Sequence, residues 1–166
     1  MCNLPDWLPD LLLFEDFGGD WQRYEDEVFA KFYSDFIESR PTFQNEPVYI
    51  TKYPLKKGKE RGFWHCVQEG PVEEDRTPDI RRCERIRWVR PVIEHSNYPK
   101  VKKWPTQKAG KNRYLLWLEE ADYLVILEKR PGCWFLWTAY CTDFEHTRRK
   151  RRAEYEAYIK SQRRPV

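Results

Sequence analysis

Hydrophobic residues follow a helical period in the first quarter of the chain. Between Trp21 and Ile37, apolar side chains recur every three or four residues, which predicts one apolar face of a helix that runs to about Glu38. Asp20 precedes this segment and is a suitable N-cap, and Pro41 follows it as a stop signal. The prolines in the stretch before it predict an irregular lead-in.

Strand residues come next. Residues 48–53 and 63–67 are rich in β-branched and aromatic side chains, which favour strands. The polar segment between them contains Gly58, which suits a turn. The sequence therefore predicts that these two segments pair as a hairpin.

A second helix and a basic segment follow. Apolar positions over residues 79–95 fit a helix, with Thr77 as N-cap, Pro78 at the first helical position and a kink at Pro91. Residues 97–111 carry five lysines together with prolines and a glycine, and this composition predicts an open basic loop.

Three strands are expected in close succession, over residues 113–118, 123–128 and 133–140. Their connections are too short for parallel crossovers, so they predict an antiparallel meander. In the last strand, the alternation of side chains places Thr138 and Tyr140 on one face, together with Trp134 and Leu136.

The pattern ends with a helix over about 143–161, preceded by a capping box of Thr142 and Glu145. The order of elements predicts an α+β fold. We expect an antiparallel sheet of about five strands packed by N-terminal, central and C-terminal helices.

The length and the distribution of charges indicate how the chain is organised. A chain of 166 residues predicts one domain, residues 1–166. Residues 1–47 form an acidic helical extension with 3 basic and 11 acidic residues, whereas residues 48–166 form a basic core with 27 basic and 16 acidic residues. Residues 81–113 alone hold 11 basic and 2 acidic residues. Such asymmetry favours an anionic partner, the alternative being a solvated basic surface.

Several classes of protein are disfavoured. No apolar run approaches the roughly 18 residues of a membrane span and the start lacks a basic signal-peptide region, so we expect a soluble cytoplasmic protein with no membrane partner. The cysteines are odd in number and contain no C-x-x-C pair, which argues against a zinc site or a disulfide framework. Phosphate-binding glycine motifs and metal-ligand spacings are missing from the sequence, so we expect no cofactor and no metal.

The remaining chemistry is histidine together with many arginine, lysine and tyrosine residues. This set suits metal-independent RNA cleavage, in which the 2′-hydroxyl attacks its own phosphodiester and the protein supplies no nucleophile. An imidazole titrates near neutral pH and can move the protons, and cations can stabilise the additional negative charge of the phosphorane.

Five fragments carry a resemblance to a known group of proteins. They are RGFWHC (61–66), RCERIRWVRPVIE (82–94), RYLLW (113–117), YLVILEKR (123–130) and WFLWTAY (134–140). In this order and spacing the chain resembles phage- and mobile-element-encoded members of the superfamily that unites barnase, EndoU, colicin tRNA nucleases and RelE. The resemblance covers about residues 48–152.

The resemblance implies a helix-plus-antiparallel-sheet fold and a toxin-like, metal-independent endoribonuclease. It places the early histidine of the superfamily at His65, the basic residue of a central strand at Arg113, and the hydroxyl pair of the last strand at Thr138 and Tyr140. Arg85, in the predicted helix, is a candidate phosphate contact. The resemblance provides no position for a carboxylate base, and Glu69 is simply the nearest one to His65 in the sequence.

RNA is the expected partner, in the form of tRNA or ribosome-bound mRNA. The candidate RNA-binding residues come from the basic segments and are Arg82, Lys102, Lys103, Arg148 and Arg149. Two other functions stay open: a non-catalytic RNA- or DNA-binding module on the same scaffold, and a protein-interaction regulator of a mobile element with an antitoxin-like partner. For His65 itself, the alternative is a core histidine bonded to backbone.

Overall fold

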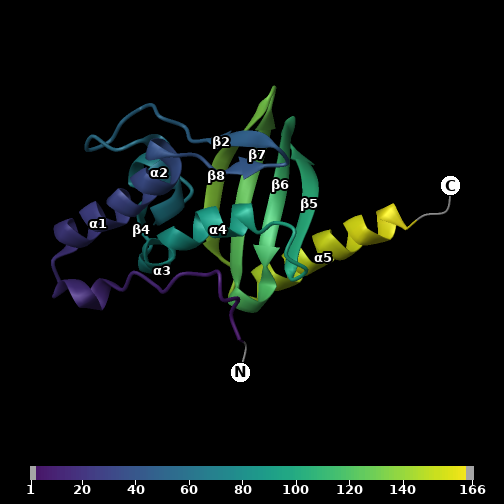
Figure 1. Cartoon of the computed structure of the whole chain (residues 1–166), viewed down its shortest axis with the longest axis horizontal. Helices are drawn as coiled ribbons and strands as arrows, with labels where there is room; N and C mark the ends of the chain where they lie inside the picture. The colour runs from purple at the N-terminus through teal and green to yellow at the C-terminus, as the bar shows by residue number, and fades with distance from the viewer. Residues whose placement is uncertain (1–2, 164–166) are drawn as a thin grey trace.

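A six-stranded sheet forms the centre of the molecule (Figure 1), in the computed structural model that describes residues 3–163. The strand order is β1-β2-β8-β7-β6-β5, and every neighbouring pair is antiparallel except β2 and β8, which are parallel. The strands are β1 (Thr42–Phe43), β2 (Glu46–Tyr49), β5 (Val101–Lys108), β6 (Lys111–Leu118), β7 (Tyr123–Arg130) and β8 (Cys133–Cys141). The predicted α+β class is confirmed, with six strands in place of about five.

Most of the helices cover one face of this sheet. These helices are α1 (Trp21–Tyr33), α2 (Arg61–Val67), α3 (Ile80–Glu84) and α4 (Val89–Glu94). The predicted cap of α1 is confirmed, because the Asp20 side chain accepts a hydrogen bond from the backbone N–H of Arg23. Val28 and Phe32 of α1 are fully buried in the same apolar core as Leu116 and Val125 of the sheet. The acidic N-terminal region is therefore packed into the core rather than appended to it.

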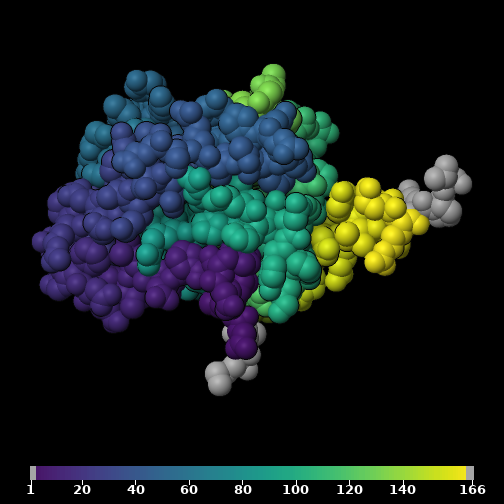
Figure 2. Space-filling model, in the orientation of Figure 1, coloured from purple at the N-terminus to yellow at the C-terminus, as the bar shows by residue number. Residues whose placement is uncertain are grey.

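The other face of the sheet is covered by α5 (Glu145–Gln162), which extends past the sheet in Figures 1 and 2. Side chains alternate along β6 and β7, so Leu116 and Val125 face the N-terminal helices while Trp117 and Leu124 face α5. Tyr155 of α5 packs on this second apolar cluster. Both faces of the sheet are therefore buried, although α5 covers only part of its own side.

The prediction of a strand over residues 63–67 is wrong, because this segment forms α2. The expected hairpin is accordingly absent: β2 pairs with β1, and it pairs with β8 only at Val48↔Trp134 and Tyr49↔Phe135. Beyond that short pairing α2 contacts β8. The two-stranded sheet of β3 (Gln68–Glu69) and β4 (Thr77–Pro78) follows α2 directly.

The helix expected over 79–95 is interrupted at Arg85, between α3 and a 3-10 turn that leads into α4. Pro91 causes no kink, because it lies in the first turn of α4, where a backbone N–H is not needed. Asp79, and not Thr77, caps α3 by accepting hydrogen bonds from two backbone N–H groups.

The basic segment 97–111 is mostly a strand and not an open loop. Residues 101–108 form β5 at the edge of the sheet, paired over their full length with β6. Pro105 is accommodated there because an edge strand leaves one side without pairing. The three later strands and the C-terminal helix agree with the sequence, but the expected capping box does not form: Thr142 instead accepts a buried hydrogen bond from the indole of Trp117 at 2.9 Å.

A β-bulge alters the faces of β8. Leu127 pairs with Leu136 whereas Ile126 pairs with Thr138, so Trp137 is the extra residue. Thr138 and Tyr140 do share a face, as predicted, but Trp134 and Leu136 lie on the opposite face with Ala139. The bulge therefore directs the two hydroxyl side chains toward the α5 side.

Two further sequence predictions concern membrane-spanning helices and the pairing of cysteines. Between residues 3 and 163, none of the helices has the length and apolar character needed to cross a bilayer. Cys66, Cys83, Cys133 and Cys141 are free thiols. Cys2, which belongs to the same sequence prediction, lies outside the described residues.

Candidate functional site

The position of His65 depends on a close approach between α2 and the chain after β2. The backbone N–H groups of Arg61 and Gly62 donate to the carbonyls of Lys52 and Thr51, at 3.0 and 2.8 Å. A Cβ on Gly62 would lie only 3.1 Å from the Cβ of Ile50, which is tighter than ordinary packing. Glycine is therefore needed at the start of α2 to place His65 beside β8.

A carboxylate and a guanidinium surround the imidazole of His65. Arg61 binds Glu73 through two hydrogen bonds, from Nε at 2.6 Å and from Nη2 at 2.7 Å. The Nε2 atom of His65 lies 3.3 Å from Oε1 of the same carboxylate. The carboxylate that contacts His65 is thus not Glu69, the nearest one in the sequence, but Glu73, in the 3-10 turn Glu73–Asp75.

The pKa values in this cluster fix the state of each group. The hydrogen bonds from Arg61 hold the pKa of Glu73 at about 2, so the side chain is ionised at neutral pH. An ionised carboxylate only accepts hydrogen bonds, so Nε2 of His65 is the donor and Nδ1 retains its lone pair. Burial lowers the pKa of His65 below its usual value, and the nearby Arg76 and Arg61 lower it as well, against the hydrogen bond to Glu73, which raises it. The imidazole is therefore neutral at neutral pH.

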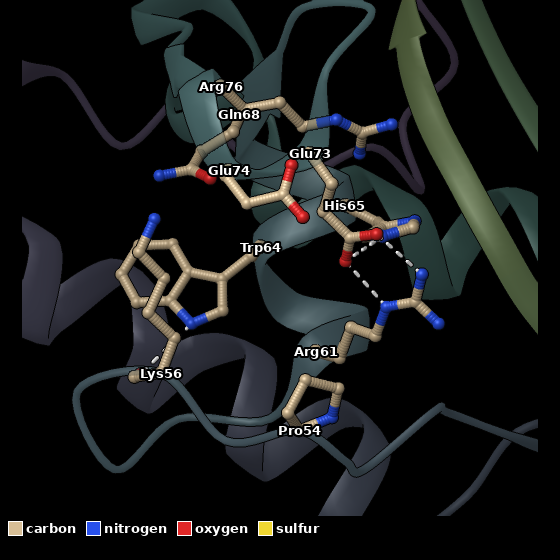
Figure 3. A pocket seen from close by; sticks show the side chains of 9 residues that line it. All are labelled: Pro54, Lys56, Arg61, Trp64, His65, Gln68, Glu73, Glu74 and Arg76. Carbon is tan, nitrogen blue, oxygen red and sulfur yellow. Dashed lines mark hydrogen bonds and ion pairs between the residues drawn. The ribbon is translucent and has the colours of Figure 1, made fainter.

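The Glu73 cluster forms one wall of a cavity of about 590 Å³, which we name the Trp64 cavity. Figure 3 shows the carboxylates of Glu73 and Glu74 directed into this space, across from the indole of Trp64. The ammonium of Lys56 lies 5.5 Å from the centre of that indole. The cavity thus combines a flat apolar surface with charged groups of both signs next to His65.

A second, smaller cavity of about 180 Å³ adjoins the first and shares His65, Gln68 and Arg76 with it. We name it the Tyr140 cavity. Its other lining residues include Arg82, Thr138 and Tyr140, which the sequence predicts as site residues. They also include Glu69, the carboxylate nearest to His65 in the sequence. Four predicted site residues therefore converge here: His65, Arg82, Thr138 and Tyr140.

Two of these residues are held by further contacts. Arg82 donates to the carbonyl of Gln68 at 2.8 Å, forms an ion pair with Asp79 at 3.2 Å, and lies 5.4 Å above the ring of Tyr140. The phenolic oxygen of Tyr140 accepts a hydrogen bond of 2.5 Å from Arg151 of α5. Both cations are thus fixed around the phenol, which leaves its own proton available for donation.

Thr138 connects the last strand to α2. Its hydroxyl donates to the carbonyl oxygen of His65 at 2.9 Å. Because the hydroxyl proton is already used in this bond, the role of Thr138 is to hold the backbone of His65 in position.

Arg113 lies beside the cavity rather than in its wall. Its guanidinium lies 4.2 Å above the ring of Trp137, and the same indole contacts the His65 ring edge-on with centroids 5.6 Å apart. Arg113 also pairs with the buried Glu128 at 3.5 Å. Trp137 therefore contacts both Arg113 and His65. Arg113 itself belongs to the surface of the sheet next to the cavity.

The other predicted residues are distributed around the molecule. Arg85 donates to the carbonyl of Arg81 and stacks on Trp88, so the structure does not bring it to His65. Lys102 pairs with Glu119, and Lys103 bonds to Asn97 at 2.6 Å. Arg148 binds Asp122 through two hydrogen bonds, at 2.8 and 2.6 Å, while Arg149 is exposed on α5. Two of these five cations, Lys102 and Arg148, are thus already matched by carboxylates.

The sequence did not single out Glu73, Arg76, Trp137 and Arg151. Glu73 lies in an acidic run that has no periodicity, and its role depends on the fold of the loop after α2. Trp137 is reassigned by the bulge, and Arg151 is one of five consecutive basic residues, 148–152, none of which the sequence distinguishes from the others.

Within residues 3–163, His, Cys, Asp and Glu side chains nowhere gather in a group that could hold a metal ion. Searches for relatives give no further guidance, because no family model, curated protein or solved structure matches the chain.

Proposed function

We propose that this protein is a metal-independent endoribonuclease that cleaves RNA by attack of a 2′-hydroxyl on the adjacent phosphorus. The observation that carries the proposal is the Tyr140 cavity. It combines a neutral imidazole backed by a carboxylate, two arginines (Arg76 and Arg82) and a phenol whose oxygen is bound by a third arginine. These are the groups needed to move two protons and to stabilise a phosphorane.

The roles follow from the contacts. Nδ1 of His65 accepts the proton of the 2′-hydroxyl as its oxygen attacks phosphorus, and Glu73 stabilises the imidazolium that forms. Arg76 and Arg82 offset the additional negative charge on the phosphoryl oxygens. The bond from phosphorus to the 5′ oxygen breaks, and the Tyr140 hydroxyl donates its proton to that oxygen while Arg151 stabilises the phenolate left behind. The products are a 2′,3′-cyclic phosphate and a 5′-hydroxyl.

This assignment revises the roles expected from the sequence, in which Arg85 and Arg113 stabilise the phosphorane while Thr138 and Tyr140 orient the scissile phosphate. Arg82 and Arg76 take the place of Arg85 and Arg113 at the phosphate, because only the former pair lines the cavity. Thr138 becomes a positioning residue, since its hydroxyl is bonded to the backbone of α2.

The proposal is tested by the chemistry of the products. Single-stranded RNA incubated with the protein in EDTA is expected to yield fragments with 2′,3′-cyclic phosphate and 5′-hydroxyl ends, measured by mass spectrometry. An otherwise identical strand with a single 2′-deoxy nucleotide is the matched control, and cleavage should stop at that nucleotide alone. Fragments ending in 3′-hydroxyl and 5′-phosphate, or no fragments while RNA binds with a steep salt dependence, would contradict the nuclease and favour a binding module.

The pH dependence tests the state of His65. Because the imidazole accepts a proton only when neutral, kcat/KM should fall toward acid with a midpoint below the usual histidine pKa of about 6.5. The hydrogen bond to Glu73 raises the pKa of His65, so Glu73→Gln should move the acid limb to still lower pH. The measurement is the pH profile of kcat/KM for both proteins.

Glu74→Gln is the matched control for that experiment, because Glu74 lies on the same turn and makes no ion pair with any described residue. Its acid limb should coincide with that of the unchanged protein. An acid limb that moves to higher pH in Glu73→Gln would remove His65 as the proton acceptor.

A further inference from the structure

A groove rich in cations lies between α5 and the hairpin of β5 and β6. It has a volume of about 390 Å³ and a floor formed by Leu115 and Ile126. Four basic side chains line it, namely Lys108, Arg113, Lys150 and Arg151, against the single acidic residue Glu154. We name it the Arg151 groove.

The two arginines of the groove have carboxylate partners, whereas the two lysines do not. Arg151 pairs with Glu154 at 3.0 Å and Arg113 pairs with Glu128 at 3.5 Å. Lys108 and Lys150 are exposed, and among the residues that the structure describes no carboxylate lies within ion-pair distance of either. Lys111, also exposed, stands directly opposite Lys108 across the β5–β6 ladder. This concentration of like charge is unfavourable by itself and favours binding of an anion.

The Arg151 groove and the Tyr140 cavity lie on the same face of the sheet, on neighbouring strands. Thr138 in the wall of the cavity pairs with Ile126, and Ile126 pairs with Leu115 in the floor of the groove. One strand spacing of about 4.8 Å therefore separates Thr138 from Ile126, the nearer floor residue, and two such spacings separate it from Leu115. Arg151 joins them physically, because it lines the groove and donates to the phenol of Tyr140 in the cavity.

We propose that the Arg151 groove binds a phosphate of the same RNA strand next to the scissile linkage, with Lys108 and Lys150 as its ligands. This inference rests on the proposed function. It defines the substrate as a single strand that crosses the sheet between α5 and α2, with contacts on more than one phosphate.

The test uses RNA binding, so that it does not depend on cleavage. Affinity for a fluorescent single-stranded RNA is measured by anisotropy at several KCl concentrations, in a His65→Gln background that keeps the RNA intact. The double variant Lys108→Ala/Lys150→Ala should weaken binding roughly three- to tenfold and lower the slope of log K against log salt by about 0.7 for each phosphate released. Lengthening the RNA by one or two nucleotides should increase the affinity of the parent protein and not that of the double variant.

Lys160→Ala is the matched control, because Lys160 is an exposed lysine ten residues further along α5. It should retain the slope of the parent protein. Equal slopes for all three proteins would overturn the groove while leaving the nuclease proposal intact. A reduced slope in the double variant, together with no RNA cleavage by the unchanged protein, would support the groove and overturn the nuclease. Competition by polyglutamate as effective as that by RNA would assign the groove to an acidic protein and overturn its role in RNA binding.

Discussion

Replacement of His65 by glutamine should lower the rate of RNA cleavage by about 10²- to 10⁴-fold, the usual contribution of a positioned proton-transfer group. Glutamine retains an amide N–H that can donate to Glu73, so the bonds between Arg61 and Glu73 are preserved. Compared with histidine, the glutamine side chain lacks only the nitrogen lone pair that accepts the proton. The measurement is the initial cleavage rate, with RNA affinity determined in parallel.

His95→Gln provides the matched control. His95 is exposed, stacks on Trp7 with ring centroids 4.3 Å apart, and lies on the loop after α4. Its replacement should leave the rate unchanged. A rate for His65→Gln within about threefold of the parent, in protein with an unchanged melting temperature, would rule out proton transfer by this residue and reduce it to a buried structural histidine.

Replacement of Phe32 by alanine should lower the free energy of unfolding by about 3–5 kcal/mol. Phe32 of α1 is fully buried and packs on Phe36 and on Phe63 of α2, with ring centroids 5.1 and 5.4 Å apart. Loss of the phenyl ring removes these ring contacts and leaves a cavity between α1 and α2. The measurement is chemical denaturation, with the melting temperature expected to fall by roughly 2–4 °C for each kcal/mol.

Tyr33→Ala is the control, since Tyr33 is the next residue of the same helix and is 39% exposed. It should change stability by roughly 0.5 kcal/mol. If Phe32→Ala costs no more than Tyr33→Ala, the acidic N-terminal region does not unfold together with the sheet. The comparison therefore measures whether α1 is part of the cooperative core.

A helix is predicted best from the sequence where one of its faces is exposed. The helix that begins at Trp21 shows a clear period because its polar and apolar residues alternate with exposure. By contrast, every residue from Gly62 to Gln68 is buried, so α2 has no polar face and no helical period. Its aromatic and β-branched residues have strand propensity, and tertiary packing overrides it.

The strand β5 is missed for the opposite reason, because few of its side chains are buried. Only Val101 and Trp104 are buried in this edge strand, and its lysines, proline and glutamine give it the composition of a loop. The pairing with β6 that defines the strand lies in backbone hydrogen bonds and leaves no signature in the side chains.

The candidate site was predictable in its residue types and only partly in its arrangement. His65, Arg82, Thr138 and Tyr140 converge on one cavity, although the predicted strand around His65 is a helix. The partner Glu73 was inaccessible to sequence reasoning because it approaches His65 through a turn whose path depends on the small sheet of β3 and β4.

The extra residue in β8 has a consequence for how this strand tolerates change in length. Deleting Trp137 would restore uninterrupted pairing with β7, so the ladder itself gains regularity. The same deletion moves the side chains of one half of β8 to the opposite face of the sheet. Either Thr138 and Tyr140 turn into the apolar core beneath α2, or Trp134 and Leu136 turn out of that core. The number of residues in β8 thus sets on which side of the sheet Thr138 and Tyr140 lie, and a chain one residue shorter or longer here would be expected to keep the fold while losing the Tyr140 cavity.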